Sequence, residues 1–277
     1  MSAALRAPPT FTQALRGFVS LADKTARARV AYRAAILVSL CTSALGYVVF
    51  FLVWRELYAS GTASALMPQA DLFSYLVVAF VLNFALSLQV EGRFGQRLRQ
   101  GLIAADLLRP LGFLSFQLAQ ALGDLAMNLV FAVPVYAVGF FFLGPGVLPP
   151  SATALSCGVV SVGLALLVNF AISYLLVQVS FVTQTLYGVY FARAALHQAF
   201  SGVAAPLAMF PGALATWAHA MPFRHVIETP ARILLGQARH SEIPGLLFGQ
   251  AAWALGLLAL SSAIFNAVLK RHQIQGG

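Results

Sequence analysis

One acidic residue, Asp124, lies well inside an apolar stretch of the sequence. In a helix, Gln117, Gln120 and Asn128 would fall near the same face. A carboxylate inside a membrane segment is rare and typically marks a substrate or ion pathway, so Asp124 and Asn128 are candidate pathway residues. Asp124 could instead lie about one turn from the membrane surface and reach interfacial water, and the sequence leaves that alternative open.

Two asparagines in other apolar stretches, Asn83 and Asn169, are candidates for the same pathway. Asn169 lies one helical turn from Ser173, a spacing that is also typical of hydrogen bonds between membrane helices. A coupled secondary transporter should carry acidic residues near mid-membrane or an internal repeat. The sequence has one such acid at most and no evident repeat, which argues against that class.

Known catalytic motifs are absent from the sequence. It contains no HExxH and no GxSxG, and neither Lys24 nor Lys270 follows a glycine-rich turn that could form a P-loop. Three histidines share the segment 211–242, but their spacing matches no zinc site, and Cys41 and Cys157 lie inside apolar runs. We therefore expect no catalytic residue, metal site or cofactor in this chain, which should not hydrolyse ATP itself.

The composition indicates an all-α integral membrane protein. Of 277 residues, 60% are hydrophobic and 9% are charged, whereas a soluble domain has roughly 25% charged residues. Disorder is excluded because disordered chains are polar and highly charged. Because a charge at mid-bilayer is costly, charge-free intervals predict the spans. Five are clear: 34–54, 72–90, about 120–143, 152–179 and 243–269.

The distribution of basic residues predicts a sixth span. The segment before residue 34, the linker 91–111 and the tail 270–277 are all basic and should be cytoplasmic. Both termini on one side require an even number of spans, so a stretch of about 186–210 should also cross. Thirteen of the 17 basic residues are then cytoplasmic, and the net charge of +9 reflects topology rather than nucleic-acid binding.

Three segments should be helical without crossing the membrane. Residues 10–30 within the N-terminal segment 1–30 have an apolar stripe that predicts an interfacial helix, although a flexible basic tail is the alternative. The linker 91–111 predicts an amphipathic cytoplasmic helix that could dock a protein or rest on lipid headgroups. The outer segment 211–242 is too broken for a span and should form one or two short re-entrant helices. All lie in or flank one transmembrane domain, 31–269.

Two runs of the sequence resemble a known family. Gly101-Leu102-Ile103 and Leu107-Leu108-Arg109-Pro110-Leu111 resemble the coupling region of type-2 ATP-binding-cassette (ABC) export permeases. The region before the last span is similar to the same family in its order of Ser201-Gly202, Pro206-Leu207, Phe210-Pro211, Met221-Pro222-Phe223 and Thr229-Pro230. The sequence departs from the family at Glu228, where an aromatic residue is more usual, and near Thr183-Gln184, where a Trp is.

The resemblance implies a permease subunit in the bacterial inner membrane. Its partners would be an ABC ATPase, which binds ATP and magnesium, and a second permease subunit, identical or related. The residues expected to dock the ATPase are Arg97, Arg99, Leu102, Asp106 and Arg109. The nearly uncharged interior favours a hydrophobic or amphipathic substrate, while the direction of export follows from the resemblance alone. A secondary transporter or channel without an ATPase is the alternative.

Overall fold

The computed structural model describes residues 11–61, 67–102, 105–106, 112–183 and 187–275. Every regular element in these ranges is a helix, as the composition predicts. In chain order they are α1 (Phe11–Ala31), α2 (Arg33–Ala59), α3 (Gln69–Ala85), α4 (Val90–Arg99), α6 (Phe113–Leu143), η1 (Gly144–Val147), α7 (Ala152–Thr183), α8 (Tyr187–Phe200), η2 (Leu207–Met209), α9 (Gly212–Ala220), η3 (Pro222–His225), α10 (Glu228–Leu234) and α11 (Ile243–Gln275).

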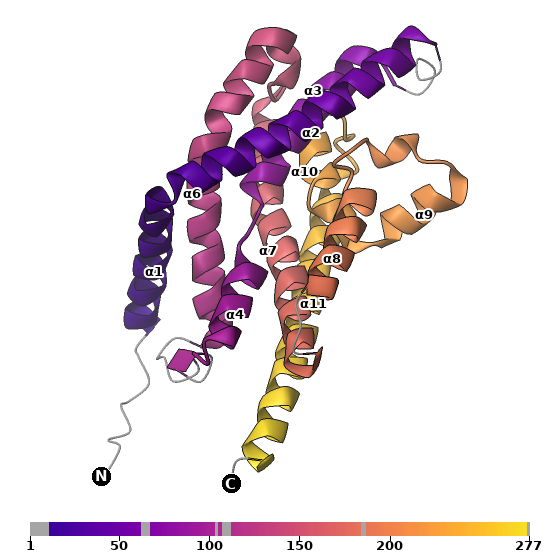
Figure 1. The fold of residues 1–277 in the computed structure, drawn as a ribbon. Coiled ribbons are helices and arrows are strands. Elements are labelled where there is room, and N and C mark those ends of the chain that lie inside the picture. The colour runs from indigo at the N-terminus through magenta and orange to yellow at the C-terminus, as the bar shows by residue number, and fades with distance from the viewer. Residues whose placement is uncertain (1–10, 62–66, 103–104, 107–111, 184–186, 276–277) are drawn as a thin grey trace.

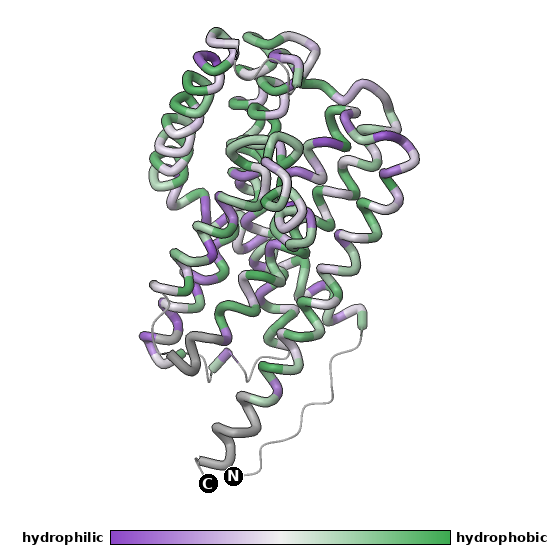
Figure 2. Tube along the Cα trace, turned by 90° about the vertical axis from the view of Figure 1, so that its right-hand side faces the viewer, coloured by the Kyte–Doolittle hydropathy of each residue, from purple (hydrophilic) through white to green (hydrophobic). Residues whose placement is uncertain are grey.

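Within the described ranges, five helical stretches are long and apolar enough to cross a membrane, and Figure 2 shows apolar residues along most of their length. They are Arg33–Ala59, Gln69–Arg97, Phe113–Val147, Ala152–Gln178 and Ile243–Ala267. These stretches correspond to the five clear spans that the charge-free intervals predict. In Figure 1, α1 begins and α11 ends at the end of the bundle where α4 lies, which we call the basic end.

The span expected over about 186–210 is not continuous. α8 has 14 residues, or about 21 Å at 1.5 Å per residue, which is short of the roughly 30 Å hydrocarbon core. The chain then leaves the helix, but the backbone N of Glu228 donates a hydrogen bond to the Ser201 carbonyl at 2.9 Å. α10 therefore begins beside the end of α8, and we call this pair of helices the split crossing. Residues 202–227 make an excursion between them that holds η2, α9 and η3 (Figure 1).

The expected span 72–90 and the helix expected over 91–111 also differ from the structure. α3 ends at Ala85 and α4 starts at Val90, so the helix is interrupted at 86–89. We call these four residues the α3–α4 break. α4 in turn ends at Arg99, because Gly101 has a φ of +68° that stops a right-handed helix. Most of the remaining linker lies outside the described residues.

Other expected elements are present. α6 and α7 form a hairpin through η1, where Gly144 has a φ of +71°. The short helices α9 and α10 occupy the segment expected to be re-entrant. α1 occupies the expected interfacial region and packs along α6 (Figure 1). A Cβ added at Gly123 would lie 2.5 Å from the Ala22 carbonyl oxygen, so the glycine allows the two helices to approach closely.

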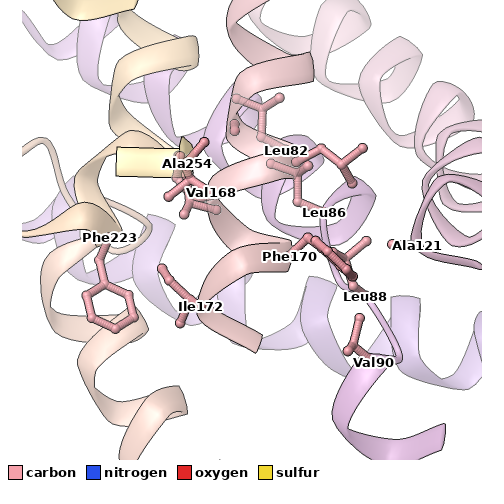
Figure 3. Close-up of a cluster of buried hydrophobic side chains, with 14 of the residues drawn as sticks. Leu82, Leu86, Leu88, Val90, Ala121, Val168, Phe170, Ile172, Phe223 and Ala254 are labelled. Atoms are coloured by element: carbon pink, nitrogen blue, oxygen red, sulfur yellow. The ribbon is translucent and has the colours of Figure 1, made fainter. Parts of the chain in front are cut away.

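The buried core lies where α3, α7, α10 and α11 meet. Its largest fully buried side chains include Tyr75, Phe170 and Tyr174. Leu86 and Leu88 of the α3–α4 break belong to the same cluster as Phe170 of α7, as Figure 3 shows. The leucines of the break are therefore held inside the protein, whereas Ser87 and Gln89 are exposed.

Candidate functional site

Asp124 on α6 is fully buried, and it is paired with basic residues from two other helices. Its carboxylate accepts hydrogen bonds from Arg93 on α4 at 2.8 Å and from Arg29 on α1 at 3.3 Å. A third donor is the backbone N of Gln89 in the α3–α4 break, at 3.0 Å. A buried carboxylate persists when it is paired and hydrogen-bonded in this way. In this structure these three donors surround the carboxylate, and the side chain of Asp124 itself has no exposed surface.

Asn128, one helical turn along α6, continues this set of contacts. Its side-chain oxygen accepts a hydrogen bond from Arg29 at 2.8 Å. Its Nδ2 donates to the carbonyl oxygens of Ser87 at 3.1 Å and Ala85 at 3.3 Å. These carbonyls lost their helical partners where α3 ended. Asp124 and Asn128 therefore join α1, α4 and the α3–α4 break to α6.

Asn169 on α7 holds the break from the other side. Its Nδ2 donates to the Leu86 carbonyl at 2.7 Å, and its Oδ1 accepts from Arg193 on α8 at 2.6 Å. Arg193 also forms an ion pair with Glu91 on α4 at 3.0 Å. α7 and α8 lie far from α4 in the sequence. Arg193 of α8 pairs directly with Glu91 of α4, and Asn169 of α7 links Arg193 to the α3–α4 break.

Asn83 on α3 contacts α8 as well, because its Oδ1 lies 3.0 Å from His197 Nε2. All four residues predicted to line a pathway are thus hydrogen-bonded around the α3–α4 break, and their role in a pathway stays a prediction. We call the whole set the polar layer. It comprises Arg29, Asn83, Glu91, Arg93, Asp124, Asn128, Asn169, Arg193 and His197.

The sequence did not identify the basic members of this layer. In the sequence, Arg29, Arg93 and Arg193 are simply positive charges near the ends of apolar stretches. The sequence does indicate that such partners exist, because a buried acid or amide needs a hydrogen-bond partner and the apolar spans contain few polar side chains. The need for a partner does not indicate which arginine pairs with which acid.

The residues expected to dock an ATPase are only partly free to do so. Asp106 is buried, and its carboxylate pairs with Arg97. Arg99 is exposed, as is Leu102. The remaining expected contact, Arg109, lies outside the described residues. α4 is fixed to the bundle through Phe94, which is fully buried and packs edge-on to Phe113 with ring centroids 6.2 Å apart.

At the point where the split crossing is interrupted, a second set of contacts fixes the turn after α8. The hydroxyl of Tyr75 donates to the Gly202 carbonyl at 2.8 Å, and the indole N of Trp54 donates to the Ala204 carbonyl at 3.1 Å. Glu228 is fully buried, and its carboxylate lies 3.5 Å from Arg224 Nε. Gly202 has a φ of +82° and would place a Cβ 2.5 Å from the Tyr75 hydroxyl, so the turn requires glycine.

Within the part of the chain that the structure describes, no three His, Cys, Asp or Glu side chains lie close enough to hold a metal ion. Of the three histidines in the outer segment, His225 is buried and lies 3.1 Å from the hydroxyl of Thr229. The described contacts of the polar layer join helices to one another.

A family model described as "ABC-2 family transporter protein" matches residues 37–276, which is most of the chain. The chain belongs to the ABC-2 transporter family. No curated protein matches it. Membership agrees with the resemblance of the two sequence runs and makes this ABC-2 chain a multi-pass membrane component of an ABC transporter, not the ATPase. An ABC-2 component implies a partner ATPase.

Proposed function

We propose that this ABC-2 chain is the permease subunit of an ABC exporter in the cytoplasmic membrane, with both termini in the cytoplasm. A separate ATPase supplies the energy, and the substrate is a hydrophobic or amphipathic molecule. The observation that carries the proposal is the position of α4. It lies at the basic end and is joined by ion pairs to α6 through Asp124 and to α8 through Arg193.

These ion pairs offer a mechanical route from an ATPase to the spans. An ATPase that contacts Arg99 and Leu102 would push on α4 when it closes on ATP. Because Phe94 and Arg93 hold α4 against the bundle, α4 would move together with α6 and α8 rather than slide past them. Tilting of these helices would open a path away from the basic end.

A second permease subunit would complete the pathway. Large apolar side chains remain exposed on several long helices, including Leu45 on α2, Phe141 on α6 and Leu255 on α11. Lipid and a second subunit are the two apolar environments that such surfaces fit. One chain of this size would form half of the transporter, and the second could be identical or related.

The test is to purify the gently solubilised chain and to identify any soluble polypeptide with a P-loop that comes with it. We expect an ABC ATPase, and transport in proteoliposomes only when both proteins and ATP are present. Transport by the pure chain without nucleotide would overturn the proposal in favour of a secondary transporter or channel.

A variant pair locates the docking surface. Arg99→Glu should reduce copurification and stimulation of the ATPase by about tenfold, the effect of losing one close interfacial charge contact. Arg239→Glu makes the same charge change at a side chain that is 86% exposed in the outer segment, before α11, and should leave both unchanged. Equal behaviour of the two variants would refute docking at α4.

A further inference from the structure

A cavity of about 640 Å³ lies between the α1–α2 junction and α4, within the size range of small-molecule sites. Its wall is chemically divided. Three basic side chains, Lys24, Arg29 and Arg93, line one part, and the apolar side chains of Ile36 and Phe84 line another. The function proposed above makes no use of this cavity.

The basic part of the wall has more positive charge than its acids neutralise. Asp124 is the one carboxylate that pairs with Arg29 and Arg93 among the described residues. The neighbouring acid on α1, Asp23, pairs with Arg27, and Glu91 on α4 pairs with Arg193. Lys24 is exposed and adds a further positive charge at the rim.

The arginines also keep donors that no described residue accepts. Nε and Nη2 of Arg93 and Nε of Arg29 are buried and have no hydrogen-bond partner among the described residues. Guanidinium groups favour phosphate or carboxylate oxygens as partners because they can bind them through two parallel hydrogen bonds. An anion in this part of the cavity would offset the excess positive charge of these side chains.

The apolar part selects for a molecule with a hydrocarbon chain. Ile36 and Phe84 are buried, while the neighbouring α2 residues Leu37 and Val38 are 46% and 66% exposed. A chain bound against Ile36 and Phe84 could therefore continue along apolar surface. An inorganic anion would leave this part of the cavity unused.

We propose that this cavity binds an anionic amphiphile, with its phosphate or carboxylate against Lys24, Arg29 and Arg93 and its hydrocarbon chain against Ile36 and Phe84. An acidic lipid of the bilayer and a free acidic amphiphile share this chemistry. The inference does not depend on the proposed transport function, because binding can be measured without ATPase or nucleotide.

The test uses the full chain in nanodiscs that contain phosphatidylglycerol with a photoactivatable acyl chain, followed by peptide mapping. We expect crosslinks at residues 32–39 and 84–96, and few from the equivalent phosphatidylcholine. Lys24→Gln should reduce the crosslinking about fivefold, the effect of one cation near an acidic headgroup. Arg16→Gln, which removes a charge from the same helix outside the cavity, should not. Lys24 was chosen because Arg29 and Arg93 also support the polar layer.

A second pair tests the sign of the charge. Gln96→Glu places an acid in the cavity wall and should weaken labelling, whereas Gln100→Glu, just beyond α4, should not. Equal labelling by phosphatidylglycerol and phosphatidylcholine would overturn the proposal. It would also be overturned if Lys24→Gln had the same effect as Arg16→Gln, or if Gln96→Glu had the same effect as Gln100→Glu. So would competition by inorganic phosphate as strong as that by dodecyl phosphate, since the chain would then contribute nothing. Mass spectrometry of the purified chain separates the sources. Retained phosphatidylglycerol indicates a bilayer lipid, and an empty cavity that dodecyl phosphate fills indicates a free amphiphile.

Discussion

Asp124→Asn should destabilise the protein, and the size of the effect follows from the contacts of the carboxylate. Loss of one partner from a buried ion pair costs about 3–5 kcal/mol. The side chains of Arg29 and Arg93 are 17% and 22% exposed, so water can solvate them in part. The asparagine also keeps one acceptor oxygen. We therefore expect a loss of about 2–3 kcal/mol in the free energy of unfolding.

Thermal unfolding of the purified chain in detergent measures this loss. Asp71→Asn is the matched control, because Asp71 is exposed on the first turn of α3 and should change stability by less than about 0.5 kcal/mol. Combining Asp124→Asn with Arg93→Gln should be less harmful than the sum of the two, with a coupling of about 1–2 kcal/mol.

The result that refutes this reasoning is specific. If Asp124→Asn unfolds at the same temperature as the unmodified chain but abolishes transport by the assembled complex, Asp124 acts on the substrate. The polar layer would then be a pathway, as its position in the sequence first indicated, and the ion pair with Arg93 would be incidental.

Three further outcomes are expected. Gly123→Ala should displace α1 from α6 and cost about 1–3 kcal/mol, measured by thermal unfolding, whereas Gly163→Ala on α7, with open space around it, should cost nothing. Gln250→Leu should cost about 0.6–2 kcal/mol by the same measurement, because this buried amide on α11 donates to two backbone carbonyls and no leucine can. Exchanging Arg97 and Asp106 for each other keeps their ion pair but reverses the local charges. We expect ATPase binding to be unchanged, because Asp106 is buried and the pair is internal, whereas lost binding would show that the pair is a docking contact.

The positions of the five apolar helical stretches could be predicted because few charges interrupt them. The split crossing could not, because it depends on a hydrogen bond between Ser201 and Glu228, 27 positions apart in the chain. Gly202 and Pro206 are typical turn residues, yet the same pattern fits a loop after a complete span.

In the candidate site, too, single residues could be predicted from the sequence, whereas contacts between distant residues could not. Asp124 stood out in the sequence because a buried carboxylate is exceptional. Its partner Arg29 lies 95 positions away, and local periodicity says nothing about contacts at that distance. The end of α4 at Arg99 was also missed, since the apolar repeat continues through 102 and 105 while a single glycine conformation ends the helix.

The split between α8 and α10 has a consequence for motion. Bending a continuous helix within a bilayer breaks backbone hydrogen bonds that no water replaces, and each loss is costly. Among the described residues, one backbone hydrogen bond, from Glu228 to Ser201, joins the ends of the two halves, and side chains hold the turn between them. α8 is tied to α4 by Arg193, while the end of α10 packs against the α6–α7 hairpin at Pro150. One half is therefore held to the basic end and the other to the hairpin. A change in the angle between α8 and α10 would therefore not require any helical hydrogen bond to break.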